Sequence, residues 1–271
     1  MARRYSTALV TGASSGMGKD IALRLLKEGL TVYVAARSVD RMADLAEAGA
    51  IPIAMDITKD AEITAAAEQI HAGHGGVDIL VNNAGFGQYG PVEETPIDSA
   101  RYQFEVNLFG LARLTQLLLP PMRQNRKGLV INISSMGGKI YTPLGAWYHV
   151  TKHALEGWSD CLRLELAEFG IDVVIAEPGL INTGFTAGVQ THFAASAESA
   201  YAGLIGKLVE AVDSDGASSP PSVISDLVIR AIRADRPRTR YAGGKMARPV
   251  LFLRWLISDR MFDRMIMSRF T

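Results

Sequence analysis

The stretch Thr7-Ala-Leu-Val-Thr-Gly12-Ala-Ser-Ser-Gly16-Met-Gly18 determines how this chain begins to fold. Its first five residues are apolar or β-branched, which predicts a buried strand over Thr7–Thr11. The glycines that follow permit a tight turn, and a helical pattern over Met17–Glu28 continues from them. A strand, a glycine turn and a helix in direct succession form the first part of a βαβ unit.

The same alternation of strand and helix continues along much of the chain. Further strands are predicted at Thr31–Ala36, Ile51–Met55, Ile79–Asn82, Leu129–Ile133 and Asp172–Ala176, and helices at Asp40–Glu47, Asp60–His71, Ser99–Arg123 and Tyr148–Glu168. Nearly continuous apolar strands indicate a mostly parallel sheet that helices cover on both faces. The predicted fold class is therefore a doubly wound, Rossmann-type α/β sheet, whose ligand binds at the carboxyl ends of the strands.

The alternation ends after Pro178, and the rest of the chain is predicted to belong to the same domain, residues 1–271. A small-residue-rich segment at about residues 182–221 has the position of a substrate lid. A last helix is expected at Ser222–Ala234, followed by a short strand near Tyr241.

The glycine turn has the spacing Gly12-x-x-x-Gly16-x-Gly18. Gly12 allows the tight turn, Gly16 lets the backbone approach a pyrophosphate, and Gly18 lets helix and strand pack closely. The free N–H groups at the start of the helix would then face the phosphates. An ordinary strand–helix turn is the alternative interpretation.

The end of the second strand indicates which dinucleotide would bind. Sites for NAD usually place an acid there for the ribose hydroxyls, but this strand ends Ala36-Arg37-Ser38. A guanidinium pairs strongly with a 2′-phosphate, and Ser38 can add a hydroxyl. The sequence therefore predicts NADP(H); the alternative is that Arg37 is a solvated loop residue.

Tyr148 and Lys152 lie four residues apart on a predicted helix and therefore share one face. An ammonium beside a phenol favours the phenolate, so we expect the pKa of Tyr148 to fall below its usual value. Such a phenol can transfer a proton, and the Ser135 hydroxyl could hold the oxygen that receives it. The pair alone fits equally well an exposed lysine beside a half-buried aromatic ring.

Together these motifs resemble the short-chain dehydrogenase/reductase family over about residues 5–185. The resemblance rests on the glycine turn, Asn82-Asn-Ala-Gly85, Asn107, Ser135, Tyr148, Lys152, Pro178-Gly179 and Thr183, which occur in the family's order. Within the family, Phe86–Thr95 and Ala176–Phe185 are similar to the 17β-hydroxysteroid-dehydrogenase-like and retinol-dehydrogenase-like branch.

The resemblance implies a role for each matched residue. Tyr148 would be the general acid in reduction and the general base in oxidation, Lys152 would lower its pKa and bind the nicotinamide ribose, and Ser135 would position the substrate oxygen. Asn107 would hold a water in a proton relay toward Lys152. The implied cofactor-binding residues are Gly12, Ser14, Ser15, Gly16, Met17, Gly18, Arg37, Ser38, Asp56 at the adenine, Ile57, Asn83, Ala84, Gly85, Tyr148, Lys152, Pro178, Gly179, Ile181, and Thr183 at the nicotinamide amide.

The residues near these motifs are apolar and aromatic, and they include no obvious arginine that would bind a substrate carboxylate or phosphate. We therefore expect a lipophilic ketone, aldehyde or secondary alcohol. The candidate pocket residues are Phe86, Met136, Tyr141, Trp147 and Phe185, with Tyr89, Gly137, Leu144, Leu180 and Phe193 as further candidates. Each of these side chains fits a place in the core equally well.

The segment at about residues 245–271 is amphipathic, with apolar residues interleaved with arginines. It is expected either to pack over the pocket or a neighbouring subunit, or to make peripheral contact with a membrane surface. The family resemblance also implies a homodimer or homotetramer formed through the two long helices. Their candidate contact residues are Leu111, Leu114, Leu118, Leu155, Leu162 and Leu166.

Composition narrows the other possibilities. The 271 residues carry no net formal charge, which gives no indication of nucleic-acid binding. The single cysteine, Cys161, is interpreted as a packing residue and suits a reducing cytoplasm, and neither a signal peptide nor an apolar run of about 18 residues is recognised. His149 and His153 lack a third ligand, so they are interpreted as surface residues and no metal is expected.

Three functions remain open at this point. The leading hypothesis is an NADP(H)-dependent carbonyl reductase or alcohol dehydrogenase. The alternatives are a catalytically silent dinucleotide-binding sensor or scaffold, and an epimerase or dehydratase of the same fold. The complete Ser/Tyr/Lys/Asn set argues against the silent protein, and the glycine spacing argues against the third function.

Overall fold

The computed structural model describes residues 5–183, 199–214 and 218–269. Seven parallel strands form one sheet in the order β3-β2-β1-β4-β5-β6-β7. The strands are β1 (Thr7–Thr11), β2 (Thr31–Ala36), β3 (Ile51–Ala54), β4 (Ile79–Asn82), β5 (Gly128–Ile133), β6 (Ile171–Pro178) and β7 (Arg240–Gly243). The predicted doubly wound fold is confirmed, and the strand order reverses between β1 and β4.

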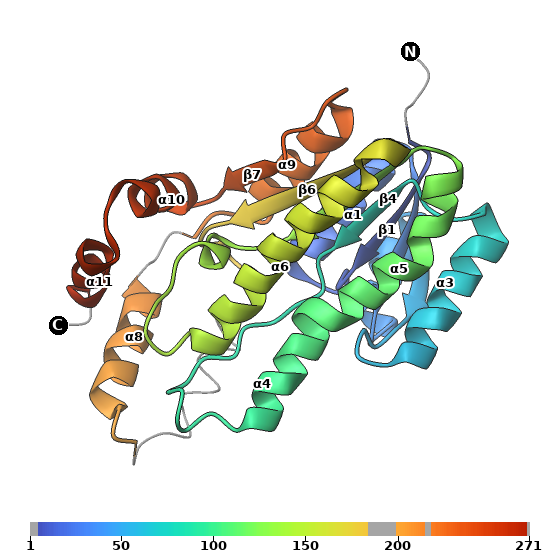
Figure 1. Ribbon diagram of the computed structural model, residues 1–271. Coiled ribbons are helices and arrows are strands. Elements are labelled where there is room, and N and C mark those ends of the chain that lie inside the picture. The colour runs from blue at the N-terminus through green and yellow to red at the C-terminus, as the bar shows by residue number, and fades with distance from the viewer. Residues whose placement is uncertain (1–4, 184–198, 215–217, 270–271) are drawn as a thin grey trace.

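Helices cover both faces of the sheet (Figure 1). One face is covered by α1 (Gly16–Lys27), α2 (Ala43–Glu47) and α9 (Ser222–Arg233), and the other by α3 (Asp60–His74), α5 (Gly110–Gln124) and α6 (Ala146–Leu166). Successive strand residues alternate between the two cores: Val10 packs on the α1 side and Leu9 on the α3 side. The apolar strands are continuous because both of their faces are buried.

The predicted helix at Ser99–Arg123 is interrupted. The structure has α4 (Ile97–Phe104), a π-helical turn at Glu105–Phe109, and then α5. A π-helical turn inserts an extra residue into the helical ladder, and hydrophobic periodicity does not reveal it. Asn107 lies in this widened turn, and the earlier helix predicted at Asp40–Glu47 likewise begins with a 3₁₀ turn, Asp40–Met42.

The six leucines expected at a subunit interface are buried within the chain, so that prediction is wrong. The six are Leu111, Leu114, Leu118, Leu155, Leu162 and Leu166. They form the inner stripes of α5 and α6, where an amphipathic helix packs against the sheet. The apolar side chains exposed along the long helices include Phe109, Val150 and Leu164.

A buried polar network fixes α5 and α6 to the strand ends. The amide nitrogen Nδ2 of Asn82 donates to Thr115 Oγ1 at 3.2 Å and to Asn132 Oδ1 at 2.8 Å. Asn132 Nδ2 in turn donates to Ser159 Oγ at 2.8 Å. Because buried polar groups need their partners, these bonds hold both helices in one position relative to β4 and β5.

The carboxyl-terminal part of the chain extends from the β7 edge of the sheet (Figure 1). It contains α10 (Ala247–Leu256) and α11 (Asp259–Met267), and α8 (Ala202–Ser214) lies within the segment expected to be a lid. The helix expected at Ser222–Ala234 and the short strand near Tyr241 are present as α9 and β7, but α9 is not the last helix, because α10 and α11 follow it. Among the described residues, no helix is both long and apolar enough to cross a membrane.

Candidate active site

The glycine turn after β1 packs against the loop after β4. Gly12 has a φ of +66°, and a side chain there would lie 2.8 Å from Ala84 Cα. A side chain at Gly18 would collide with the amide of Asn83 and with the carbonyl oxygen of Gly12. Ser15, at the N-cap of α1, makes no side-chain cap bond, and no acid lies in the first helical turn. Packing against the loop after β4 therefore requires glycine at positions 12 and 18, and the uncapped N-terminus of α1 offers backbone N–H groups of the kind that bind phosphates.

Asn83 holds this turn in place. Its Nδ2 donates to the carbonyl oxygen of Thr11 at 2.9 Å, while the backbone N–H groups of Asn83 and Ala84 both donate to Thr11 Oγ1 at 3.0 Å. The amide thus faces the turn itself. Asn83 shapes the predicted cofactor site by tying the ends of β1 and β4 together.

Arg37 and Ser38 are exposed just beyond the carboxyl end of β2. In the described part of the chain, no carboxylate forms an ion pair with Arg37, whose NH1 lies 3.5 Å from the Tyr102 hydroxyl. Burial acts to raise the pKa of Asp56 at the end of β3, but hydrogen bonds from Thr58 and the positive charge of Arg37 lower it overall. This edge therefore offers an available guanidinium and suits a 2′-phosphate.

The predicted contacts after β6 come back toward the same turn. Gly179 N–H donates to the carbonyl oxygen of Gly243 at 2.8 Å, and Ile181 is buried in the core on the α1 side. A side chain at Gly16 would meet Thr183 Cγ2 at 3.3 Å. Thr183 therefore lies beside the glycine turn. No local sequence pattern predicts this contact, because the two segments are far apart along the chain.

Ser135, Tyr148 and Lys152 meet at the carboxyl end of β5. Ser135 begins a 3₁₀ turn and accepts a hydrogen bond from Gly137 N–H at 3.0 Å, and its hydroxyl also hydrogen-bonds with the Tyr148 phenol. Lys152 Nζ donates to the carbonyl oxygen of Ile133 at 2.8 Å. Tyr148 and Lys152 are both buried, on the face of α6 that covers the strand end.

Asn107 completes the group. Its Nδ2 donates to the carbonyl oxygen of Phe86 at 2.9 Å and to Thr151 Oγ1 at 3.1 Å, and its Oδ1 accepts from Phe86 N–H at 3.0 Å. A side chain at Gly85 would lie 3.1 Å from Asn107 Oδ1 and 3.7 Å from Lys152 Nζ. The structure therefore brings the four residues predicted to be catalytic together.

The expected fall in the pKa of Tyr148 is wrong for this structure. Burial raises the pKa of Tyr148 to about 12, and the hydrogen bond with Ser135 offsets only part of this effect. Burial lowers the pKa of Lys152 to about 8, against a partial opposing effect from Glu156. Removing a phenolate or an ammonium from water disfavours its charged form, and helical spacing does not reveal that penalty.

The expectation that His149 lies at the surface is also wrong, because its side chain is only 6% exposed. Its Nε2 accepts from Thr142 N–H at 3.1 Å, so the neutral ring donates from Nδ1 to the carbonyl oxygen of Gly137 at 2.9 Å. These bonds fix the loop that follows Ser135 onto the first turn of α6. Only its position beside Tyr148 hinted at this role, whereas His153 is exposed as expected.

An apolar wall stands beside Tyr148. The ring of Tyr89 lies 5.6 Å from the Tyr148 ring, and its hydrophobic cluster includes Leu144 together with Ile205 and Leu208 from α8. Leu144 has a φ of +63°, a strained conformation for a branched residue. Through this wall α8 reaches the site, although residues 184–198 of the expected lid lie outside the described residues.

The predicted pocket residues lie in different places. Tyr141 turns toward α11, where its hydroxyl donates to Asp263 Oδ1 at 2.9 Å and its ring contacts Phe262. Phe86 packs its ring 5.6 Å from that of Tyr102 on α4. Met136 and Trp147 flank the site and are partly buried, and Phe185 and Phe193 lie outside the described residues.

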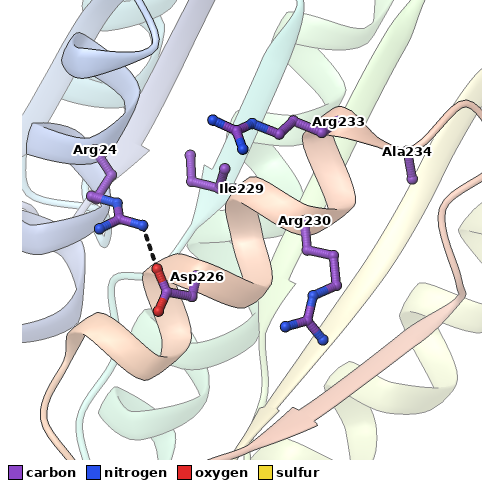
Figure 2. A pocket seen from close by; sticks show the side chains of 6 residues that line it. All are labelled: Arg24, Asp226, Ile229, Arg230, Arg233 and Ala234. Carbon is purple, nitrogen blue, oxygen red and sulfur yellow. Dashed lines mark hydrogen bonds and ion pairs between the residues drawn. The ribbon is translucent and has the colours of Figure 1, made fainter.

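A surface depression lies elsewhere, between α1 and α9 (Figure 2). Arg24 points toward Asp226 and pairs with it, whereas Arg230 extends away from that pair (Figure 2). Arg233, also in the lining, pairs with Glu28 at 2.7 Å. The depression lies on the α1 face of the sheet, and none of the predicted catalytic residues lines it.

Comparisons with known proteins agree with this geometry. The model of the short chain dehydrogenase family matches residues 6–193. An NADPH-dependent 3-dehydrocapnine reductase from Ornithobacterium rhinotracheale is 33% identical, over 95% of this chain and 94% of the relative. A short-chain dehydrogenase structure from Streptomyces avermitilis is 34% identical with a TM-score of 0.84, covering 99% of this chain and 96% of that chain.

A second solved structure, a single-residue variant of actinorhodin polyketide ketoreductase with NADPH, is 35% identical with a TM-score of 0.73 and covers 86% of this chain and 92% of that one. That structure has the same fold and contains bound NADPH, and the reductase from Ornithobacterium is named for its use of the same cofactor. The chain therefore belongs to the short-chain dehydrogenase family and is an NADP(H)-dependent dehydrogenase or reductase.

Proposed function

We propose that this enzyme interconverts a lipophilic ketone or aldehyde and its alcohol, with Tyr148 as the general acid in reduction and the general base in oxidation. The observation that supports this most directly is the Ser135–Tyr148 hydrogen bond at the strand end, with Lys152 and Asn107 beside it. The alternative, a silent dinucleotide-binding protein, has no need of such an arrangement.

The protein groups act mainly on the proton. With a pKa of about 12, the Tyr148 phenol is protonated at neutral pH and ready to donate to a carbonyl oxygen. Ser135 holds that oxygen, and the Lys152 ammonium stabilises the negative charge that develops on the phenol. NADPH, when bound, supplies the hydride to the carbonyl carbon. Asn107 fixes the loop beside Lys152 and, by family resemblance, a water in the relay that returns the proton.

Residues at the ends of β1, β2 and β3 would bind the cofactor. The glycine turn would receive the pyrophosphate, Arg37 and Ser38 the 2′-phosphate, and Asp56 the adenine. The absence of an acid at the tip of β2 and the exposed guanidinium support this assignment. Thr183 beside Gly16 supports its predicted contact with the nicotinamide amide.

A lipophilic substrate is supported by the wall of Tyr89, Leu144 and α8 beside the phenol. Two similar proteins are named as a 3-dehydrocapnine reductase and a polyketide ketoreductase, and these names support the reduction of a keto group. We further propose a cytoplasmic homodimer or homotetramer, supported by Phe109, Val150 and Leu164, which remain exposed along the long helices. The similarity to the 17β-hydroxysteroid-dehydrogenase-like branch stays a prediction.

The test measures NADPH consumption with aliphatic and aromatic ketones and aldehydes, and with small charged keto acids. Tyr148→Phe should lower kcat/KM by about 10²–10⁴, because it removes the proton donor, and should change the Kd for NADPH far less, because the other predicted cofactor contacts remain. Tyr33→Phe, which alters a buried hydroxyl bonded to His74 far from the site, is the control and should retain activity.

Two results would contradict the proposal. Full activity in Tyr148→Phe would exclude the proton-transfer role, and activity confined to small charged keto acids would exclude a lipophilic pocket. If wild-type protein binds NADPH but reduces none of the carbonyls, the silent-protein alternative gains support instead.

A further inference from the structure

The C-terminal strap, defined as α10 and α11 with residues 247–267, is anchored to the substrate side by its inner face. Phe262 is fully buried, and its ring lies 5.3 Å from the ring of Tyr141. Ile266 packs against the cluster of Leu144, Ile205 and Leu208 that forms the pocket wall. The strap therefore has one fixed orientation relative to the substrate side.

The outer face of α10 is apolar and exposed. Phe252 is 61% exposed, Trp255 79% and Leu256 60%, and the rings of the first two lie 6.0 Å apart. Their spacing of three and four residues places them on one side of the helix. We call these three residues the α10 face. Clustered large apolar groups at the surface mark an interaction site, whereas single ones do not.

The charges around the α10 face are unbalanced. Six basic and two acidic residues lie between positions 245 and 271 of a chain that has no net charge. Both acids are already engaged: Asp259 pairs with Arg254 at 2.7 Å within the strap, and Asp263 accepts from the Tyr141 hydroxyl. Arg248, Arg260 and Arg264 are exposed and, among the described residues, form no ion pair.

We propose that the α10 face docks on the surface of an anionic lipid bilayer. Trp and Phe favour the boundary between acyl chains and headgroups, and arginines beside them bind headgroup phosphates. A helix that lies at the bilayer surface in this way requires no membrane-spanning segment. Docking there would place the pocket wall close to the source of lipophilic molecules, although lipid binding itself does not depend on the reaction proposed above.

A second copy of the chain fits this surface less well. In a two-fold dimer the same patch meets itself. Arg248, Arg260 and Arg264 of each copy would then approach those of the other, and the carboxylates that could neutralise them are already engaged within the strap or with Tyr141. A phosphate-bearing bilayer supplies the opposite charge over the whole patch.

The test is co-sedimentation of the full-length protein with phosphatidylglycerol-containing vesicles and with pure phosphatidylcholine vesicles. Binding to the anionic vesicles should be strong at low ionic strength and weaken as salt is added. The double variant Phe252→Ser/Trp255→Ser should weaken vesicle binding by at least about tenfold, because the two aromatic side chains that would enter the bilayer are lost. Arg248→Gln/Arg260→Gln should weaken it by about fivefold per arginine.

Ile97→Ser is the matched control, because Ile97 is 51% exposed at the start of α4 but lies outside the strap. It should bind vesicles as the wild type does, and all variants should reduce a water-soluble carbonyl at unchanged rates. Absence of sedimentation with anionic vesicles, or equal sedimentation with both vesicle types, would overturn the proposal. So would an oligomer seen by light scattering that dissociates in Phe252→Ser/Trp255→Ser without any vesicle binding.

Discussion

The two sides of the sheet's carboxyl edge are built in different ways. On the cofactor side, the proposed binding groups lie in short loops directly after β1, β2 and β4, and backbone atoms and glycines dominate. On the substrate side, the loop before α6 is held by His149, and α8 and α11 reach it from distant parts of the chain. A site of the first kind follows from local sequence, whereas one of the second kind depends on packing between distant segments.

Arg37→Gln should have the largest effect that is confined to the cofactor side, namely on the affinity for NADPH. We expect it to raise the Kd for NADPH by about 10–100-fold, the effect of losing a charge-assisted hydrogen bond to phosphate, and to leave the Kd for NADH unchanged. Fluorescence titration with both cofactors measures this. Arg41→Gln, at another exposed arginine nearby, is the control. Equal weakening of NADH and NADPH would show that Arg37 does not recognise the 2′-phosphate.

His149→Leu should have the converse effect, acting on catalysis alone. Loss of the bonds to Gly137 and Thr142 frees the loop that carries Ser135, so kcat/KM should fall by about tenfold while the Kd for NADPH stays constant. Steady-state kinetics and titration measure the two quantities, and His149→Asn should recover part of the loss. His153→Leu, one turn further on α6, should behave as wild type. Weaker NADPH binding in His149→Leu would show that the two sides are not separable.

The smallest expected effect concerns stability and pH. Burial and the neighbouring Glu156 raise the pKa of Glu177, at the end of β6, to about 7. A carboxyl whose folded pKa is raised stabilises the fold at low pH, and its contribution is lost as the pH rises through about 7. The lowered pKa of Asp56 on the cofactor side has the opposite sign: its contribution is present above its usual pKa and is lost as the pH falls.

Glu177→Gln should therefore stabilise the protein, relative to the wild type, more at about pH 8 than at about pH 5. Its effect on the free energy of unfolding should differ between the two pH values by on the order of 1 kcal/mol, after allowance for screening by solvent and Arg240. Chemical denaturation at the two pH values measures it, with the exposed Glu165→Gln as control. A pH-independent difference between wild type and Glu177→Gln would place the titration in another group.

Sequence reasoning succeeded where a residue's role follows from its neighbours along the chain. Gly12 and Gly18 needed only the strand before them and the helix after them, and the structure places both against the loop that carries Asn83. It failed where burial decides. His149 was expected at the surface, and Leu114 and Leu155 were expected at an interface, yet each is covered by segments far away in sequence.

The sequence by itself determined the doubly wound sheet, the glycine turn, the arginine at the tip of β2 and the identity of the four residues at the strand ends. The four residues are those predicted to be catalytic: Asn107, Ser135, Tyr148 and Lys152. All of these features follow from periodicity, turn chemistry, charge and the order of motifs along the chain, which are properties of the sequence. Only the tertiary structure decided that burial raises the pKa of Tyr148, that Tyr141 belongs to the contact with α11, and that α10 exposes an apolar face. Each of these depends on which distant groups exclude water from a side chain, because desolvation shifts a pKa and burial removes apolar surface from water.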